Sequence, residues 1–200
     1  MIRRVLSVLS VVGLAGGLLA ANVLADKETE KKFDTTCVVS GGPAKKEIVE
    51  KVGGKEVYFC CPNCPKAFKA DPKKFDLKVK QQWLETSQIT QVGCLMNGKP
   101  FDTTATAKLG KADVAFCCES CKGEFENADD KAKVAFANFD KAFTLQTSCP
   151  VSGKPLNAAQ VVEHQGKKVY FCCPGCPAAF KKEPEKFLSK LPQFAKDEKK

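Results

Sequence analysis

The chain has 200 residues, a formal net charge of +9 and twelve cysteines, but only one histidine. Both arginines, Arg3 and Arg4, stand at the N-terminus, so every later cation is a lysine. Proteins that read nucleic acids rely on arginine for bidentate contacts to bases and phosphates, and we therefore expect no nucleic-acid partner. The lysine excess is typical of a solvated surface that keeps a protein soluble.

The first 25 residues have the organisation of an export signal. Arg3 and Arg4 precede an uncharged apolar run, and Val23-Leu24-Ala25 places small residues at the −3 and −1 positions of a cleavage site. An uncleaved anchor is the alternative, because about 17 apolar residues approach the shortest bilayer span. The sequence thus predicts a signal peptide over residues 1–25 and an exported protein, periplasmic or secreted, with no other membrane association.

After the signal, one cysteine pattern occurs three times. The pattern is C-x22-C-C-x2-C, and its leading cysteines are Cys37, Cys94 and Cys149. We interpret the copies as three tandem modules, over residues 33–88, 89–145 and 146–200. A unit of roughly 55 residues is near the lower limit at which an apolar core holds a fold unaided, and it usually needs a disulfide or a metal as a staple.

Each module is expected to contain the same elements in the same order. Glycine and proline at matched places predict a tight turn after the leading cysteine. A β-hairpin follows, which reverses at Gly53-Gly54, at Gly110 and at Gln165-Gly166. The remaining cysteines then stand at the start of a short helix. The fold class is therefore α+β.

Two further helical segments are predicted between the modules. Apolar residues recur at three- and four-residue intervals over residues 78–90, which include Trp83, and over residues 134–145, which include Phe139 and Phe143. We expect these segments to pack the modules together. The single histidine, His164, stands beside a hairpin turn and has no counterpart in the other copies, which favours a solvent-exposed position over a ligand.

The repeated cysteines have the character of a metal site. Thiolates are soft ligands suited to zinc, copper(I) and other thiophilic metals. Cys60 and Cys64 are one helical turn apart, where the helix dipole and free amides favour anionic sulfur. Cys37 would reach the same point from the opening turn. The predicted metal ligands are Cys37, Cys60, Cys64, Cys94, Cys117, Cys121, Cys149, Cys172 and Cys176.

The neighbouring cysteines Cys61, Cys118 and Cys173 are second-line ligands or redox-active thiols. Adjacent residues rarely aim at one point without strain, so each of the three either completes a tetrahedral site or stays outside it. A closed four-sulfur site is typical of structural zinc, whereas an open three-thiolate site favours copper(I) or metal exchange.

The cysteine spacing, with an aromatic before the second cysteine and Phe68 four residues after the last, resembles the TRASH-type, YHS-related metal-binding domains. The resemblance implies small treble-clef-like zinc-finger relatives that handle heavy metals, including copper. Zinc-ribbon members of that superfamily carry a second cysteine in the opening turn. Here that place is held by Ser40, Asn97 and Ser152.

Two other functions fit part of the pattern. Export, small units and an even number of cysteines favour a disulfide-stapled interaction protein without metal. Cys61-Pro-Asn-Cys64 and Cys173-Pro-Gly-Cys176 have the CPxC form of thiol–disulfide oxidoreductases, although a unit of this size has no room for their βαβ context. We expect a metal-binding protein rather than an enzyme, with a metal ion as its cofactor and a metal-donor or acceptor protein as its partner.

Overall fold

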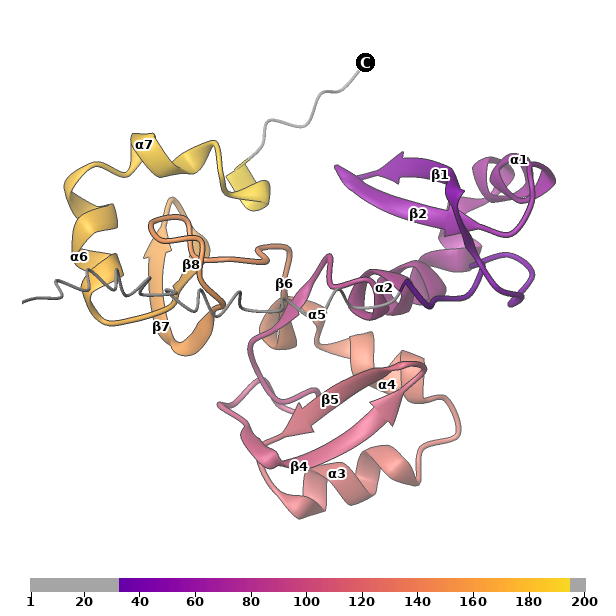
Figure 1. Cartoon of the computed structure of the whole chain (residues 1–200). Helices are drawn as coiled ribbons and strands as arrows, with labels where there is room; N and C mark the ends of the chain where they lie inside the picture. Colours follow the sequence, from indigo (N-terminus) through magenta and orange to yellow (C-terminus); the bar gives the residue numbers. More distant parts are fainter. Residues whose placement is uncertain (1–32, 195–200) are drawn as a thin grey trace, which may run out of the picture. The chain divides into compact units, whose positions relative to one another are not determined.

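The computed structural model describes residues 33–194 (Figure 1), so the predicted signal peptide lies outside the described residues. The chain divides into two units, Met1–Lys31 and Lys32–Lys200, and all the elements below belong to the second. Helices and small antiparallel sheets alternate along it, which confirms the α+β class. Within the described range, no helix combines the length and the apolar character needed to cross a membrane.

Three antiparallel β-hairpins dominate the described chain. They pair β1 (Lys45–Val52) with β2 (Lys55–Phe59), β4 (Asp102–Leu109) with β5 (Ala112–Phe116), and β7 (Asn157–His164) with β8 (Lys167–Phe171). Two hairpins reverse through residues with positive φ at both central positions, 56° and 76° at Gly53-Gly54 and 49° and 74° at Gln165-Gly166. Such turns match the right-handed twist of the flanking strands. The predicted turns are confirmed.

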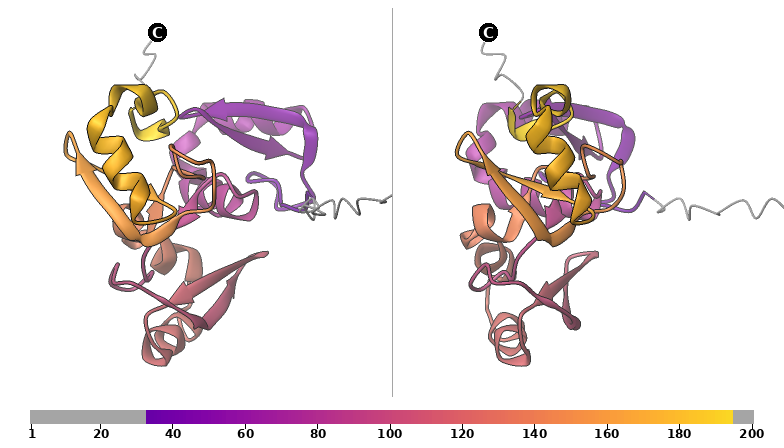
Figure 2. Two further views of the ribbon diagram at one scale, coloured as in Figure 1. Left: turned by 60° about the vertical axis from the view of Figure 1, so that its left-hand side comes forward. Right: turned by 90° about the vertical axis from the view of Figure 1, so that its left-hand side faces the viewer.

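A short helix follows each hairpin and packs on it through a phenylalanine. The helices are α1 (Asn63–Ala70), α3 (Glu119–Glu126) and α6 (Gly175–Lys182), and Figure 2 shows α6 alongside the β7–β8 hairpin. In each copy, a phenylalanine ring from the helix packs against the phenylalanine ring at the end of the hairpin, with ring centroids 5.1–5.6 Å apart. The pairs are Phe59–Phe68, Phe116–Phe125 and Phe171–Phe180. These rings are buried together with the leading cysteine of each copy, so each core lies directly beneath the thiols.

The segments after these helices differ from one copy to the next. They are η1 (Pro72–Phe75), α2 (Asp76–Glu85), β3 (Thr90–Gln91), α4 (Lys131–Ala137), α5 (Phe139–Ala142), β6 (Phe143–Thr144), α7 (Glu185–Leu188) and η2 (Pro192–Phe194). The helix expected over residues 78–90 ends at Glu85, and the one expected over 134–145 is broken. Phe143 is extended, with φ −127° and ψ 157°, because β6 pairs with β3.

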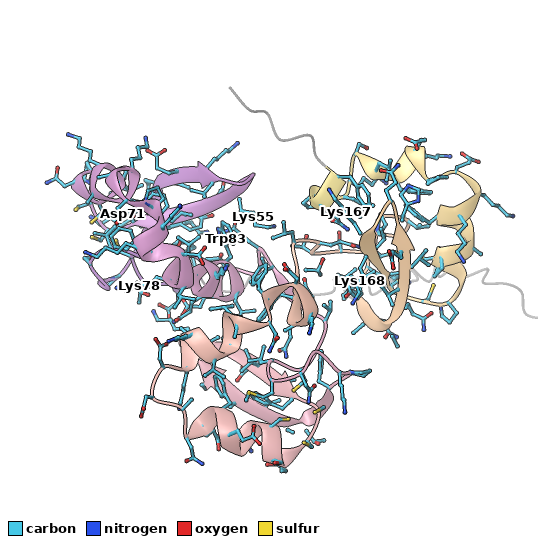
Figure 3. All side chains as sticks on the ribbon, turned by 180° about the vertical axis from the view of Figure 1, so that it is seen from behind. Lys55, Asp71, Lys78, Trp83, Lys167 and Lys168 are labelled. Carbon is cyan, nitrogen blue, oxygen red and sulfur yellow. The ribbon has the colours of Figure 1, made fainter. Side chains whose placement is uncertain are left out.

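Side-chain hydrogen bonds join the first hairpin to helix α2 and to later segments of the chain. The Trp83 indole N–H donates to the carbonyl of Glu56 at 3.1 Å, and the Lys55 ammonium donates to the carbonyls of Gln88 and, at 3.0 Å, Leu145 (Lys55 and Trp83 are labelled in Figure 3). Lys55 is only 8% exposed, and its burial lowers the pKa of the ammonium. The first hairpin is therefore joined to the chain segments that follow α2 and β6.

His164 does not occupy the exposed turn predicted for it. The residue ends β7, and its half-buried ring meets Phe180 edge-on with centroids 5.3 Å apart and Phe194 at 5.7 Å. The turn itself is formed by the next two residues, Gln165 and Gly166. Side chains alternate between the two faces of a strand. As the last residue of β7, His164 lies on the face that packs against helix α6, so its imidazole points toward Phe180 rather than toward solvent.

Candidate metal centre

Each leading cysteine lies in the same backbone turn. The Cys37 N–H donates to the carbonyl of Gly42 at 2.7 Å, and the Gly41 N–H donates to the carbonyl of Cys37 at 2.8 Å. Both bonds recur around Cys94 and Cys149. The turn requires a left-handed residue, with φ of 76° at Gly41, and glycine adopts this conformation without steric cost. It holds the leading thiol at most 1% exposed in all three copies.

Three sulfurs gather at one point in every copy. The thiols of Cys37, Cys60 and Cys64 lie within 4.8 Å of one another, and Cys60 Sγ is 3.5 Å from Cys64 Sγ. The same distance limit holds for two further groups, Cys94, Cys117 and Cys121, and Cys149, Cys172 and Cys176. All nine predicted ligand residues are thus brought together in threes. Clustered thiols of this kind suggest metal binding.

The thiols reach the cluster from three different elements. Helix α1 begins at Asn63, so Cys60 lies before it, directly after β2, and is not separated from Cys64 by a helical turn as predicted. The reason lies in the chain direction: β2 must turn over Cys61-Pro62 before the helix can fold back on the hairpin. Cys37 comes from the opening turn, Cys60 from the strand end and Cys64 from the first helical turn.

The second-line cysteines stay outside the three-sulfur clusters. Cys61 Sγ contacts Cys64 Sγ at 3.5 Å, and Cys173 Sγ contacts Cys176 Sγ at 3.4 Å. Cys118 Sγ lies 3.9 Å from the Sγ of its neighbour Cys117. All twelve cysteines are free thiols. Each fourth sulfur also hydrogen-bonds a second member of its cluster, Cys60 for Cys61, Cys172 for Cys173 and Cys121 for Cys118.

A polar side chain from the opening turn approaches each cluster. Ser40 Oγ lies 3.2 Å from Cys60 Sγ, and Ser152 Oγ lies 3.1 Å from Cys172 Sγ. In the second copy the Asn97 amide donates to Cys117 Sγ at 3.4 Å and to Cys121 Sγ at 3.6 Å. These side chains hydrogen-bond a sulfur but supply no soft ligand.

The leading thiol is poised to ionise. Burial by itself raises the pKa of Cys37, but hydrogen bonds from the Ser40 amide and hydroxyl and from the Cys60 and Val39 amides outweigh it and lower the pKa to about 6. At Cys149, hydrogen bonds from Ser152 and from the amides of Cys172 and Val151 likewise outweigh burial, and the pKa falls to about 6. The pKa of Cys94 is also lowered, although burial opposes it, with the Cys117 amide as the main donor.

The helical thiol of each cluster shifts in the opposite direction. Burial and the hydrogen bonds with neighbouring thiols raise the pKa of Cys64 to about 12 and that of Cys176 to about 12, and the same causes raise the pKa of Cys121. The first and third metal-free clusters therefore each hold a leading thiolate at neutral pH together with a helical thiol that keeps its proton. A soft cation would replace that proton and bind the sulfurs already gathered there.

Comparison with known proteins identifies one domain. The family model of the YHS domain matches residues 148–190, a stretch that contains the whole third cluster, Cys149, Cys172 and Cys176. Neither the curated proteins nor the solved structures include a significant match to the chain. The YHS match over the third cluster and the three cysteine clusters together suggest metal binding.

Proposed function

We propose that this protein binds a thiophilic metal ion, copper(I) or zinc, at three thiolate sites and serves to sequester, deliver or sense it. The observation that carries the proposal is the threefold recurrence of a three-sulfur cluster, with all sulfurs within 4.8 Å of one another. Nothing in core packing requires three thiols to meet, since a buried thiol otherwise behaves as a small apolar side chain. The residues in each cluster fit a metal ion because each offers one soft sulfur.

The geometry favours an open site over a closed one. A structural zinc site takes four protein ligands in a tetrahedron, whereas each cluster here gathers three sulfurs and has Ser40, Asn97 or Ser152 beside them. Three thiolates suit copper(I), and a site without a fourth strong ligand exchanges its metal more readily. We therefore favour copper(I) carried for transfer over zinc held as a structural staple.

The remaining parts of the proposal come from the sequence. Three tandem treble-clef-like modules of the YHS and TRASH type would each hold one metal ion, with no reaction on a substrate. The signal-like residues 1–25 would direct the protein to the periplasm or the cell exterior. There it would receive metal from a donor protein or pass it to an acceptor protein.

Native mass spectrometry with thiol counting tests the proposal directly. The reduced whole chain, supplied separately with copper(I) and with zinc, is expected to bind up to three metal ions. The bound metal should protect the nine cluster cysteines from alkylation, because a metal-bound sulfur is not a free nucleophile. Metal-free, stable protein with all twelve cysteines oxidised would contradict the proposal and support the disulfide scaffold.

Replacing the fourth sulfur distinguishes an open site from a closed one. Cys61→Ser and Cys173→Ser are expected to change the copper(I) affinity of the first and third sites less than tenfold, because neither sulfur belongs to the gathered three. Affinities are measured by competition with a coloured chelator. A loss as large as that caused by removing a cluster cysteine would make Cys61 and Cys173 ligands of closed, four-sulfur sites.

A thiol–disulfide oxidoreductase is the second candidate, and one observation favours it. In the Cys61-Pro62-Asn63-Cys64 segment, hydrogen bonds led by the Asn63 amide lower the pKa of Cys61, while Cys64 behind it has a pKa of about 12. A reactive first thiol with a resolving thiol 3.5 Å away is the arrangement that such enzymes use. Disulfide reductase turnover that disappears in Cys61→Ser would establish this function.

A further inference from the structure

One glutamine makes the same three hydrogen bonds beside each cluster. In the first copy, Gln82 Oε1 accepts from the Tyr58 N–H at 2.7 Å. Its Nε2 donates to the carbonyl of Tyr58 at 2.9 Å and to the carbonyl of Thr36 at 2.7 Å. The side chain is 1% exposed, and its carboxamide therefore finds all its partners inside the protein.

The other two copies repeat the contact with different residues. Gln91 accepts from the Ala115 N–H at 2.9 Å and donates to the carbonyls of Ala115 at 2.6 Å and Gly93 at 2.9 Å. Gln146 pairs in the same way with Tyr170, at 3.1 and 2.6 Å, and donates to the carbonyl of Ser148 at 2.9 Å.

The partners of these glutamines stand at fixed places relative to the thiols. Tyr58 is two residues before Cys60, and Thr36 is directly before Cys37. The same offsets apply to the partners of Gln91 and Gln146 in their own copies. One carboxamide thus ties the backbone that carries the leading cysteine to the backbone that carries the second cysteine.

The glutamine that makes these bonds comes from two different sequence positions. Gln91 and Gln146 each stand three residues before their leading cysteine, whereas the equivalent place in the first copy is held by the exposed Asp34. There the carboxamide comes instead from α2, through Gln82. Since two sequence positions supply the same three bonds, the bonds themselves are the common feature of the three sites.

We propose that Gln82, Gln91 and Gln146 are positioning residues that hold the first two thiols of each cluster at metal-binding distance. This inference rests on the proposed function and extends it. Groups behind the ligands of a metal site orient those ligands, and their loss typically costs 10–100-fold in affinity. A buried carboxamide with every bond satisfied also fixes the backbone in one arrangement, so the sulfurs need not be assembled when the metal arrives.

The first hairpin offers a matched control for Gln82. Gln88 makes a similar pair of bonds on the same strand, because its Oε1 accepts from the Glu56 N–H at 2.6 Å and its Nε2 donates to the carbonyl of Glu56 at 2.8 Å. The other hydrogen bond of its Nε2 goes to Thr86 Oγ1 at 2.9 Å rather than to the segment before Cys37. Gln82→Met and Gln88→Met therefore remove comparable bonds from β2, and only the first removes the link between the two thiol-bearing segments.

The test compares these variants in a whole chain that retains one intact cluster. Cys117, Cys121, Cys172 and Cys176 are replaced by serine, and cadmium(II) binding to the first cluster is titrated through the sulfur-to-metal charge-transfer band. Gln82→Met is expected to weaken cadmium binding 10–100-fold, while Gln88→Met changes it less than threefold. Far-ultraviolet circular dichroism of the metal-free proteins checks that both variants fold.

The result that overturns the inference is equal cadmium affinity in the two variants, whether both are unchanged or both are weakened. If Gln82→Met does not fold, the third cluster decides the question through Gln146→Met, in a chain whose Cys60, Cys64, Cys117 and Cys121 are serine. Unchanged affinity there would also overturn the inference. A parent chain that binds no cadmium would instead contradict the proposed function, which is a separate outcome.

Discussion

Replacing Cys176 by serine is expected to abolish metal binding at the third site and to leave two equivalents of metal on the chain. Cys176 is a member of the three-sulfur cluster and contacts both Cys172 Sγ, at 3.6 Å, and Cys173 Sγ, at 3.4 Å. A serine hydroxyl is a hard, protonated group and replaces a soft thiolate poorly. The affinity should fall by more than the roughly 100-fold that loss of a group behind the ligands costs.

The measurement is metal stoichiometry by native mass spectrometry, with copper(I) and zinc tested separately. The first and second clusters serve as internal controls, because their cysteines are unchanged and their metal should remain bound. Retention of three equivalents in Cys176→Ser would contradict the assignment of the third cluster. Loss of all three would indicate that the chain unfolds, and circular dichroism identifies that outcome.

Truncation of Phe59 is expected to destabilise the first hairpin by about 3–5 kcal/mol. The Phe59 side chain is fully buried, and its ring packs on Phe68 with centroids 5.6 Å apart. Phe59→Ala removes this contact and leaves a cavity under Cys37 and Cys64, which belong to the same core cluster. Urea unfolding followed by the fluorescence of Trp83, the single tryptophan, reports on this region because Trp83 packs against the same cluster.

Val49 provides the control for this prediction. It lies on β1 of the same hairpin but is 40% exposed, so Val49→Ala should change the free energy of unfolding by less than about 1 kcal/mol. Equal destabilisation by the two variants would show that Phe59 is not the centre of this core. Metal is removed before both measurements, because bound metal would add its own stabilisation to the folded state.

The cysteine clusters could be predicted because the same cysteine spacing occurs three times in the sequence. One spacing repeated in divergent surroundings limits which thiols can meet, and Cys37, Cys60 and Cys64 meet as expected. The hairpin turns were predictable for a local reason, since Gly53 and Gly54 supply the positive φ values that a two-residue reversal needs. In both cases the decisive residues are few and their roles are chemical or steric.

Features that depend on contacts between segments distant in the sequence could not be predicted from the sequence. The periodicity of Phe139 and Phe143 fits a continuous helix, but β6 forms because β3 offers it a pairing partner. Gln82 has the spacing of an ordinary helical residue, and only the folded chain shows that its amide reaches Thr36 and Tyr58. The recurrence of glutamine three residues before Cys94 and Cys149 was the available signal, and Asp34 interrupts it.

The short pairing of β3 with β6 has a consequence for how such chains change. Thr90 faces Thr144 and Gln91 faces Phe143, so the polypeptide enters and leaves the intervening stretch at neighbouring points. A stretch with adjacent ends is topologically an insertion, and it can be exchanged, duplicated or deleted with only a short splice to rejoin its flanks. This stretch contains the second cysteine cluster, so the number of clusters per molecule can change through a rearrangement at this one place.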